Sequence, residues 1–359
     1  MKLLVYIIQV SFFKSGMVMI GIRTDANKKI GMGHIMRCLS IASRLKELGE
    51  DAIFFTSGDY AADFIRSKGF ECFILPYEYK NKNEEIYKFI DILKDKKISK
   101  VLLDSYEVTL KYMTELNRAV KIAYIDDLNL FRYPVDLIIN YTYNTDMSLY
   151  NEWHYNPIDT KFLLGSKYIP LRSEFSKSII MCNPKVKRIF ITTGGSDEYN
   201  MLLEILQELC KSKWSKIEKL VIAGKFYGNM KELRFLELHQ ESVKIYHDIS
   251  DMARVMKKCD VAISAGGTTI AELCACGIPT IGFAVAQNQI YGLEAYSKDG
   301  IVKYAGDVRE DRKHVIDNIV INLEEFVADY NQRKQQGKLA NDLIDGDGAM
   351  RIAKEIILL

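Results

Sequence analysis

MVMIGIRTDANKKIGMGHIMRCLSIASRLKELG, residues 17–49, is the stretch that decides the fold. The apolar run 17–22 predicts a buried parallel strand, and the amphipathic run 35–49 predicts a helix. Between them, Gly31 and Gly33 allow a sharp turn whose backbone can come close to a ligand. This order of strand, glycine-rich loop and helix is typical of a phosphate or sugar site, because free N–H groups and the positive end of the helix face the ligand.

His34 stands at the start of the predicted helix. The positive field there favours a neutral imidazole, which is the form that a general base needs. A histidine that only caps the helix is the alternative, because a single G-x-G pattern is a weak signal. Arg37, one helical turn further, could contact the substrate or a carboxylate, although a surface ion pair is the commoner fate of such an arginine. Asp25, ahead of the loop, could orient the imidazole or bind a sugar substituent.

Length and composition predict two domains and exclude several classes of partner. The 359 residues are 48% hydrophobic and 27% charged, which suffices for two cores. A net charge of +2, from 49 basic and 47 acidic residues, offers no strong field for nucleic acid. The seven cysteines form no C-x-x-C pair and indicate a reducing cytoplasm. The five histidines lack metal-ligand spacing, so we expect no metal and no other cofactor.

Residues 1–13 form an apolar run at the start of the chain. The run is too short to span a bilayer, and no small-residue cleavage site follows it, so we expect no stable membrane insertion. Met17 and Met19 stand just before the first predicted strand as alternative start positions. We therefore interpret residues 1–16 as an over-extended gene start, with a membrane-touching amphipathic tail as the alternative.

Apolar runs and amphipathic segments alternate along the chain, which predicts a doubly wound α/β architecture. In the first half, the predicted strands are 17–22, 52–56, 72–75, 101–103, 122–125 and 137–139, and the predicted helices include 60–68, 84–94 and 110–120. The second half begins after a polar stretch, and its predicted strands are 188–193, 219–223, 243–246, 261–264, 280–283 and 301–304. We expect an N-terminal domain over 17–172, a C-terminal domain over 185–325 and a helical tail over 326–359.

Two further glycine turns follow predicted strands in the second half. The first turn is formed by Gly194, Gly195 and Ser196, and the second by Gly266 and Gly267. Because each turn comes directly after a buried strand, both are candidates for binding phosphate.

The second of these turns opens a predicted helix with polar residues in its first two turns. Thr268 and Thr269 can donate their hydroxyl groups to a diphosphate. Glu272 lies at i+4 from Thr268, where a carboxylate can bind both hydroxyls of a ribose. A solvated helix face is the alternative for Glu272.

Other polar residues follow strand ends, where open α/β sheets bind their ligands. Tyr106 comes after the strand 101–103, with a half-buried core tyrosine as the alternative. Asp126 and Asp127 follow the next strand and are weaker candidates. The triplet Gln287-Asn288-Gln289 follows an apolar strand and is expected to face a ligand, with a solvated loop as the alternative.

Several segments together resemble a known family. They are RTDANKKIGMGHIMRCLSIA, LLDSYEVT, AYIDDL, LLGSKYIPLRSEF, IFITTGGSD and AISAGGTTIAELCACGIPTIGFAVAQNQ, and they lie within residues 19–305. Their order and spacing resemble the UDP-2,4-diacetamido-2,4,6-trideoxy-β-L-altropyranose hydrolases of pseudaminic acid biosynthesis (PseG type). More distantly, the chain is similar to the inverting GT-B glycosyltransferase of peptidoglycan synthesis that uses UDP-N-acetylglucosamine.

The resemblance implies a GT-B-like fold, with two Rossmann-like domains that face a cleft and UDP held mainly by the C-terminal one. It implies that water attacks the anomeric carbon and expels UDP with inversion and without a metal. The catalytic residues that it implies are the base His34, the aspartate Asp25 and the tyrosine Tyr106. The binding residues that it implies are the loop glycines Gly194 and Gly195, the ribose-binding Glu272 and, near the sugar, Asn288.

We therefore expect a cytoplasmic, monomeric nucleotide-sugar hydrolase with a UDP-sugar substrate. A glycosyltransferase that uses the same UDP site and an acceptor is the main alternative, and the apolar residues 1–13 are the feature that favours it. A regulatory protein that binds UDP-sugar without turnover is a third possibility, which the presence of His34 disfavours.

Overall fold

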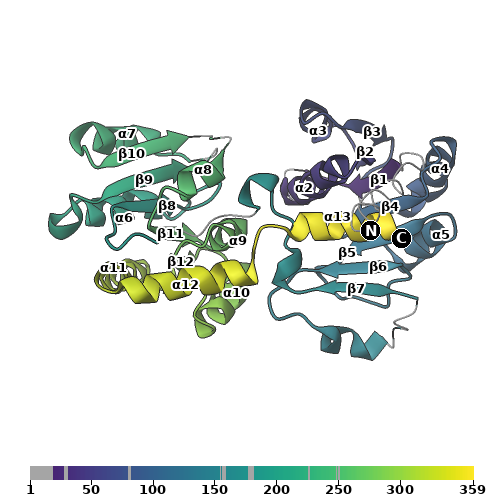
Figure 1. Ribbon diagram of the computed structural model, residues 1–359. Helices are drawn as coiled ribbons and strands as arrows, with labels where there is room; N and C mark the ends of the chain where they lie inside the picture. Colours follow the sequence, from purple (N-terminus) through teal and green to yellow (C-terminus); the bar gives the residue numbers. More distant parts are fainter. Residues whose placement is uncertain are drawn as a thin grey trace, which may run out of the picture. The chain divides into compact units, whose positions relative to one another are not determined.

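The computed structural model describes residues 19–27, 31–79, 82–153, 155, 159–176, 182–224, 227–247, 249 and 251–359. The expectation for residues 1–16 lies outside these described residues. The chain divides into two compact units (Figure 1). The first unit holds the residues up to Pro170 together with Gly348–Leu359, and the second unit holds Leu171–Asp347.

The first unit is built on a seven-stranded parallel sheet with the order β3-β2-β1-β4-β5-β6-β7. The strands are β1 (Met19–Thr24), β2 (Asp51–Ser57), β3 (Glu71–Leu75), β4 (Lys100–Asp104), β5 (Lys121–Ile125), β6 (Leu137–Asn140) and β7 (Lys161–Leu164). The helices are α2 (Gly33–Glu47), α3 (Ala62–Ser67), α4 (Lys82–Asp95), α5 (Leu110–Asn117) and α13 (Gly348–Leu358), with short 3-10 turns at Met147–Trp153 and Ser166–Tyr168.

The second unit is built on a six-stranded parallel sheet with the order β10-β9-β8-β11-β12-β13. The strands are β8 (Arg188–Thr192), β9 (Glu218–Ala223), β10 (Val243–His247), β11 (Val261–Ala265), β12 (Thr280–Ala284) and β13 (Lys303–Asp307). The helices are α6 (Met201–Leu209), α7 (Met230–His239), α8 (Met252–Met256), α9 (Thr268–Ala275), α10 (Gln287–Lys298), α11 (Arg312–Ala328) and α12 (Tyr330–Leu343), with 3-10 turns at Ser173–Phe175 and Ser212–Trp214. The doubly wound α/β class predicted from the sequence is confirmed.

In both sheets the order in which the chain adds strands reverses at one point. In the first unit β1 lies between β2 and β4, and in the second unit β8 lies between β9 and β11. The loops that leave the two central strands there run to opposite faces of the sheet, which opens a crevice at their carboxyl ends. The glycine-rich loop before α2 follows β1, and the turns at Gly194 and Gly266 follow β8 and β11.

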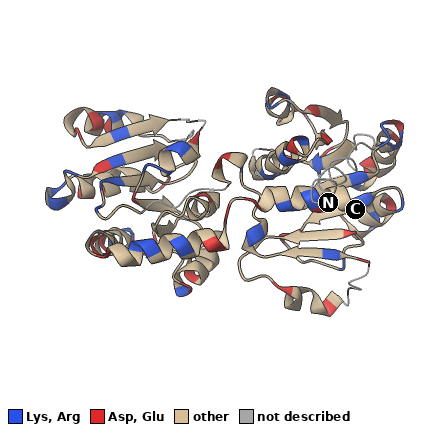
Figure 2. Ribbon diagram, in the orientation of Figure 1, with Lys and Arg blue, Asp and Glu red and all other residues tan. Residues whose placement is uncertain are grey.

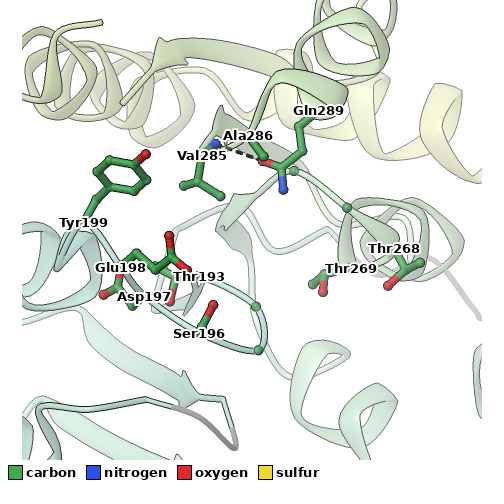
Figure 3. Close-up of a pocket in the computed structure, with 14 residues that line it drawn as sticks. Thr193, Ser196, Asp197, Glu198, Tyr199, Thr268, Thr269, Val285, Ala286 and Gln289 are labelled. Atoms are coloured by element: carbon green, nitrogen blue, oxygen red, sulfur yellow. Dashed lines mark hydrogen bonds between the residues drawn. The ribbon is translucent and has the colours of Figure 1, made fainter. Parts of the chain in front are cut away.

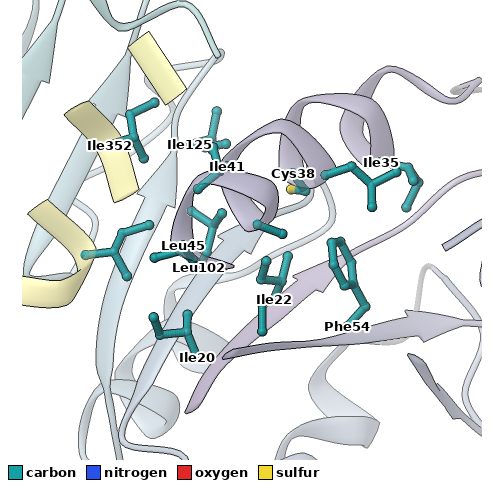
Figure 4. Packing of buried hydrophobic residues seen from close by; sticks show 14 of the residues in the cluster. Ile20, Ile22, Ile35, Cys38, Ile41, Leu45, Phe54, Leu102, Ile125 and Ile352 are labelled. Atoms are coloured by element: carbon teal, nitrogen blue, oxygen red, sulfur yellow. The ribbon is translucent and has the colours of Figure 1, made fainter. Parts of the chain in front are cut away.

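Alternating side chains of the strands divide the core of the first unit into two layers. Ile20, Ile22 and Leu102 face α2 and α13, whereas Val101 and Leu103 face α4 and α5. Figure 4 shows the first layer, in which apolar side chains of the strands meet those of α2. Because apolar layers cover both faces of the sheet, consecutive strand residues are apolar, which is why the buried strands could be recognised from their apolar runs.

Charged residues of both signs are interspersed along the helices of both units (Figure 2). This distribution agrees with the near-neutral composition of the chain.

The last residues of the chain do not form the separate helical tail that the sequence predicts over 326–359. α12 belongs to the second unit, and α13 belongs to the first, where Ala349, Ile352, Ala353 and Ile356 are fully buried. The physical reason is that α13 carries an apolar face at helical spacing, which packs against α2. The sequence also gave no prediction for the edge strand β7, and β13 begins two residues later than predicted, at Lys303.

The burial of α13 predicts a loss of stability when its apolar face is truncated. Ile352→Ala should lower the free energy of unfolding of the first unit by about 2–5 kcal/mol, because it leaves a cavity in a closed core. A Trp214→Phe background leaves Trp153 as the tryptophan reporter of the first unit in urea unfolding. The control Leu358→Ala, at a side chain that is 74% exposed, should stay within about 0.5 kcal/mol. Equal effects of both variants would contradict the packing of α13.

Candidate active site

The glycine-rich loop places His34 in the first turn of α2. Gly31 donates its N–H to the carbonyl of Asn27 at 2.8 Å, which closes the loop ahead of the helix. α2 begins at Gly33, and Met32 is its N-cap residue, with no side-chain hydrogen bond to the helix. His34 therefore does not cap the helix, and the capping alternative is wrong.

The imidazole of His34 is held by a buried carboxylate. Its Nδ1 lies 2.6 Å from Oδ1 of Asp104, which ends β4 and is fully buried. The aspartate that meets His34 is thus Asp104 and not Asp25. β4 is the neighbour of β1 in the sheet, which explains how residues 70 positions apart come together.

Arg37 binds the same carboxylate from the next turn of α2. Its Nε donates to Oδ2 of Asp104 at 2.6 Å and its Nη2 to Oδ1 at 2.5 Å, a two-point contact. Its Nη1 donates to Oδ2 of Asp127 at 2.8 Å and to the hydroxyl of Tyr141. The sequence left open whether Arg37 contacts the substrate, a carboxylate or a partner in a surface ion pair. The structure shows it in contact with two carboxylates, and its side chain is largely buried.

The charge of Asp104 determines which nitrogen of His34 carries its proton. Burial alone would raise the pKa of Asp104, but Arg37 and the hydrogen bond from His34 lower it to about 2. The ionised carboxylate can only accept hydrogen bonds, so Nδ1 of His34 must carry hydrogen. Nη2 of Arg37 lies 3.0 Å from this Nδ1 but has Asp104 as its acceptor. In the neutral ring, the lone pair then resides on Nε2, as a general base requires.

Tyr106 stands beside this pair at the end of the β4 strand. Its ring meets the imidazole of His34 edge-on, with 4.6 Å between the ring centroids. Its hydroxyl donates to Oδ2 of Asp127 at 2.9 Å, and the residue is 39% exposed. Burial and the nearby Asp127 raise the pKa of Tyr106 to about 12, so the phenol keeps its proton at neutral pH.

Asp25 has a different set of partners from the one expected. Its Oδ1 accepts from Nη1 of Arg23 at 2.8 Å and from the N–H of Ser57 at 2.6 Å, and its Oδ2 accepts from Nζ of Lys82 at 2.6 Å. The fully buried Arg23 also pairs with Glu85. Burial would raise the pKa of Asp25, but Arg23 and Lys82 lower it. This arrangement ties β1, β2 and α4 together and leaves Asp25 without a contact to His34.

In the second unit, the two predicted glycine turns line one cavity of about 460 Å³ (Figure 3). Its lining includes the predicted residues Gly194, Gly195, Ser196, Gly266, Gly267, Thr268 and Gln289. The turns meet because β8 and β11 are neighbours in the sheet. Gly194 and Gly267 have φ values of +88° and +132°, which side chains disfavour.

The two helices that start beside this cavity differ in how their first N–H groups are used. At α6, the carboxylate of Asp197 accepts from the N–H groups of Met201 and Leu202 at 2.9 and 2.8 Å. α9 has Gly267 as its N-cap, which offers no side chain to its N–H groups. The start of α9 is therefore the better place for an anion, since its donors are not already satisfied by a carboxylate.

Glu272 and Asn288 do not line this cavity. Oε1 of Glu272 accepts from Nη2 of Arg172 at 3.2 Å. Burial raises the pKa of Glu272 above its usual value, and the nearby Arg172 only partly offsets this effect. Asn288 is exposed in the first turn of α10. By contrast, Gln289 lines the cavity, and its Oε1 accepts from the N–H of Val285 at 2.9 Å (Figure 3).

Several residues of these sites were not predicted, and three of them matter most for the hydrogen bonding. Asp104 orients His34, and it could have been found as the carboxylate that directly ends a buried strand beside β1. Thr193 lines the cavity of the second unit, and its buried hydroxyl has no partner among the described residues. Asp197 lines the cavity too, and it caps α6. Nothing in the sequence distinguishes the last two from ordinary turn residues.

Within the described part of the chain, no three His, Cys, Asp or Glu side chains are grouped so that they could hold a metal ion. In the same part, none of the helices has the length and apolarity needed to cross a membrane.

Comparison with known proteins finds a family match in the second unit and similar folds among solved structures. Residues 188–292 match the glycosyltransferase family 28 C-terminal domain. Among solved structures, MurG of Acinetobacter baumannii superimposes with a TM-score of 0.67 at 11% identity, covering 96% of this chain and 100% of that one. A UDP-GlcNAc 2-epimerase of Neisseria meningitidis gives a TM-score of 0.64 at 12% identity, with 96% and 100% covered. The fold is of the GT-B type.

Two curated relatives carry the name that the sequence motifs suggested. The UDP-2,4-diacetamido-2,4,6-trideoxy-β-L-altropyranose hydrolase of Campylobacter jejuni is 25% identical, over 70% of this chain and 85% of that protein. A Helicobacter pylori protein named as both a pseudaminic acid cytidylyltransferase and this hydrolase is 24% identical over 76% of this chain. An uncharacterized protein of Methanocaldococcus jannaschii is 28% identical over 76% of this chain. The matches span only 46% and 56% of the last two proteins. The resemblance to these hydrolases is confirmed.

The contacts of Asp25 predict a role in stability. Asp25→Asn should lower the free energy of unfolding of the first unit by about 3 kcal/mol or more, because Arg23 and Lys82 lose a buried counter-charge. Since the pKa of Asp25 is lowered, this stabilisation is present at neutral pH and should fade as the pH falls below about 4.

The measurement is urea unfolding at several pH values, with Trp153 as the reporter. The control is Asp63→Asn, which removes an aspartate that is 96% exposed and should change stability by less than about 0.5 kcal/mol. An Asp25→Asn protein with unchanged stability but no turnover would instead assign Asp25 a direct catalytic role.

Proposed function

We propose that this protein is a metal-independent hydrolase that cleaves the anomeric C–O bond of a UDP-linked diacetamido-trideoxy hexose in pseudaminic acid biosynthesis. The observation that carries the proposal is the contact between Nδ1 of His34 and the ionised Asp104. Nε2 has no hydrogen-bond partner among the described residues, so it can take a proton from water. The names of the relatives from C. jejuni and H. pylori support this choice of substrate.

In the proposed reaction, the oxygen of one water attacks the anomeric carbon as the bond from that carbon to the diphosphate oxygen breaks. Nε2 of His34 accepts the proton of the water, and UDP departs with the electron pair of the broken bond. One displacement of this kind inverts the anomeric configuration. Because diphosphate is already a good leaving group, most of the task is to hold it and to aim the water.

The cavity of the second unit is the proposed site for the diphosphate. The N–H groups at the start of α9 and the hydroxyls of Thr268 and Thr269 are donors, which suit the negative charge of the phosphates. Glu272 is the proposed acceptor for the ribose hydroxyls. That role requires its carboxylate to exchange or share its contact with Arg172.

A glycosyltransferase is the second candidate function, and the match to the glycosyltransferase family 28 C-terminal domain favours it. In that case a hydroxyl of an acceptor would take the place of water beside His34. The two functions differ in a direct way, because a hydrolase releases free sugar without any acceptor.

The decisive test is to incubate the protein with a panel of UDP-sugars, without acceptor and with EDTA present, and to follow UDP and the first-formed sugar anomer by NMR. We expect release of free sugar of inverted configuration. His34→Asn should lower turnover by about 10²-fold or more through loss of the base, and Asp104→Asn should do so through loss of the correct tautomer.

UDP affinity is the control in this test and should stay within about threefold in both variants, since the proposed nucleotide site lies on other residues. Release of sugar only when an acceptor is added would favour the transferase. Wild-type turnover of His34→Asn would end the assignment of His34 as the base.

Nucleotide binding gives a separate prediction. Glu272→Ala should weaken UDP by about 1–3 kcal/mol, because a charged acceptor for the ribose hydroxyls is lost. Calorimetry of UDP measures this, and 2′,3′-dideoxy-UDP should bind the wild type and the variant alike. Glu232→Ala, on the exposed surface of α7, is the control. Unchanged UDP affinity in Glu272→Ala would leave Glu272 only as the partner of Arg172.

A further inference from the structure

Three acceptor atoms near His34 have no hydrogen-bond partner among the described residues. Nε, Nη1 and Nη2 of Arg37 each donate to Asp104, Asp127 or Tyr141. The three acceptors are Nε2 of His34, the lone pairs of the Tyr106 hydroxyl oxygen and Oδ1 of Asp127. They suit a ligand that presents N–H or O–H groups.

Asp127 is the charged member of this group, and its position is fixed. It follows the end of β5, and its side chain is 22% exposed. Its Oδ2 accepts from Nη1 of Arg37 at 2.8 Å and from the hydroxyl of Tyr106 at 2.9 Å. No donor among the described residues lies within hydrogen-bond distance of its Oδ1. One oxygen thus anchors the carboxylate while the other can accept from a ligand.

The neighbouring Asp126 shows that this free oxygen is particular to Asp127. Asp126 is fully buried, and both of its oxygens are used. Its Oδ1 accepts from the N–H groups of Leu128 and Asn129 at 3.0 and 2.9 Å, and its Oδ2 accepts from the hydroxyl of Tyr150 at 2.7 Å. Of the two adjacent carboxylates, one holds the loop after β5 and the other is open to a ligand.

We propose that Asp127 is a specificity-determining residue whose free oxygen accepts a hydrogen bond from an acetamido N–H of the sugar. This inference rests on the proposed function, because it takes the diacetamido sugar as the ligand. A fixed carboxylate attracts an N–H donor, repels the diphosphate and repels a sugar that has an ester oxygen in the place of the N–H. Selection of this kind is strong, because an analogue without the donor leaves the charged acceptor unpaired.

The test measures binding by calorimetry in a His34→Asn background, in which the ligand is not consumed. The ligands are the UDP-linked diacetamido-trideoxy hexose and two analogues, each with an ester oxygen in the place of one acetamido N–H. We expect one analogue to bind His34→Asn about 10-fold or more weakly than the parent compound. In His34→Asn/Asp127→Asn this difference should fall below about threefold, because a carboxamide can donate to the ester oxygen.

Two controls accompany the double variant. UDP itself should bind with and without Asp127→Asn alike, and His34→Asn/Asp63→Asn should keep the full difference between the ligands, since Asp63 is 96% exposed. If Asp127→Asn does not fold, NMR of the ligand bound to His34→Asn decides, and a downfield shift of one acetamido amide proton is the expected result.

Three outcomes would overturn the role of Asp127. They are an equal affinity of His34→Asn for all three ligands, a difference that persists in full after Asp127→Asn, and a parent compound that binds no more tightly than UDP. In the NMR experiment, amide protons without a shift would do the same. If the wild type binds the parent compound but does not hydrolyse it, the proposed hydrolysis fails, whereas the binding differences still decide on Asp127.

Discussion

The reversal of strand order at the centre of each sheet is the constraint on which both candidate sites depend. Parallel strands place all their carboxyl ends at one edge, and the reversal opens a crevice between two neighbouring ends. In the first unit, β1 and β4 supply the loop with His34 and the carboxylate of Asp104. In the second unit, β8 and β11 supply the two glycine turns of the cavity. Because both units have this strand order, the fold provides two crevices that could bind a ligand, whichever side chains line them.

The contact between Arg37 and Asp104 keeps an ionised carboxylate beside His34 in the first crevice. A carboxylate buried alone would tend to pick up a proton and would then no longer require hydrogen on Nδ1 of His34. Arg37 lowers the pKa of Asp104 to about 2 and so keeps it an acceptor over the physiological range of pH. Because His34 and Arg37 lie one turn apart on α2, the same helix supplies the proposed base and the positive charge that keeps its carboxylate partner ionised.

The elements and loops could be predicted from the sequence because their signals are local. Apolar runs give the buried strands, and glycines next to them give the turns at Gly31, Gly194 and Gly266. The contact of His34 with Asp104 and the return of α13 to the first unit join residues that are far apart. The sequence marks Asp104 as a carboxylate at the end of a buried strand, but it does not say which residue that carboxylate meets. Asp25 is a second example of a long-range contact that the sequence did not reveal. Its position beside the glycine loop suggested a catalytic role, but its carboxylate accepts hydrogen bonds from three donors on β1, β2 and α4.

Donors and acceptors are divided between the units in a way that matches the chemistry of a nucleotide sugar. The cavity of the second unit is lined by hydroxyls and by the N–H groups at the start of α9, which suit an anion, and also by the carboxylates of Asp197 and Glu198, of which Asp197 caps α6. The side chains around His34 offer acceptors, which suit water and the N–H groups of an amidosugar and disfavour phosphate. Arg37 is paired with Asp104 and Asp127, so among the described residues beside His34 its positive charge is already balanced by carboxylates.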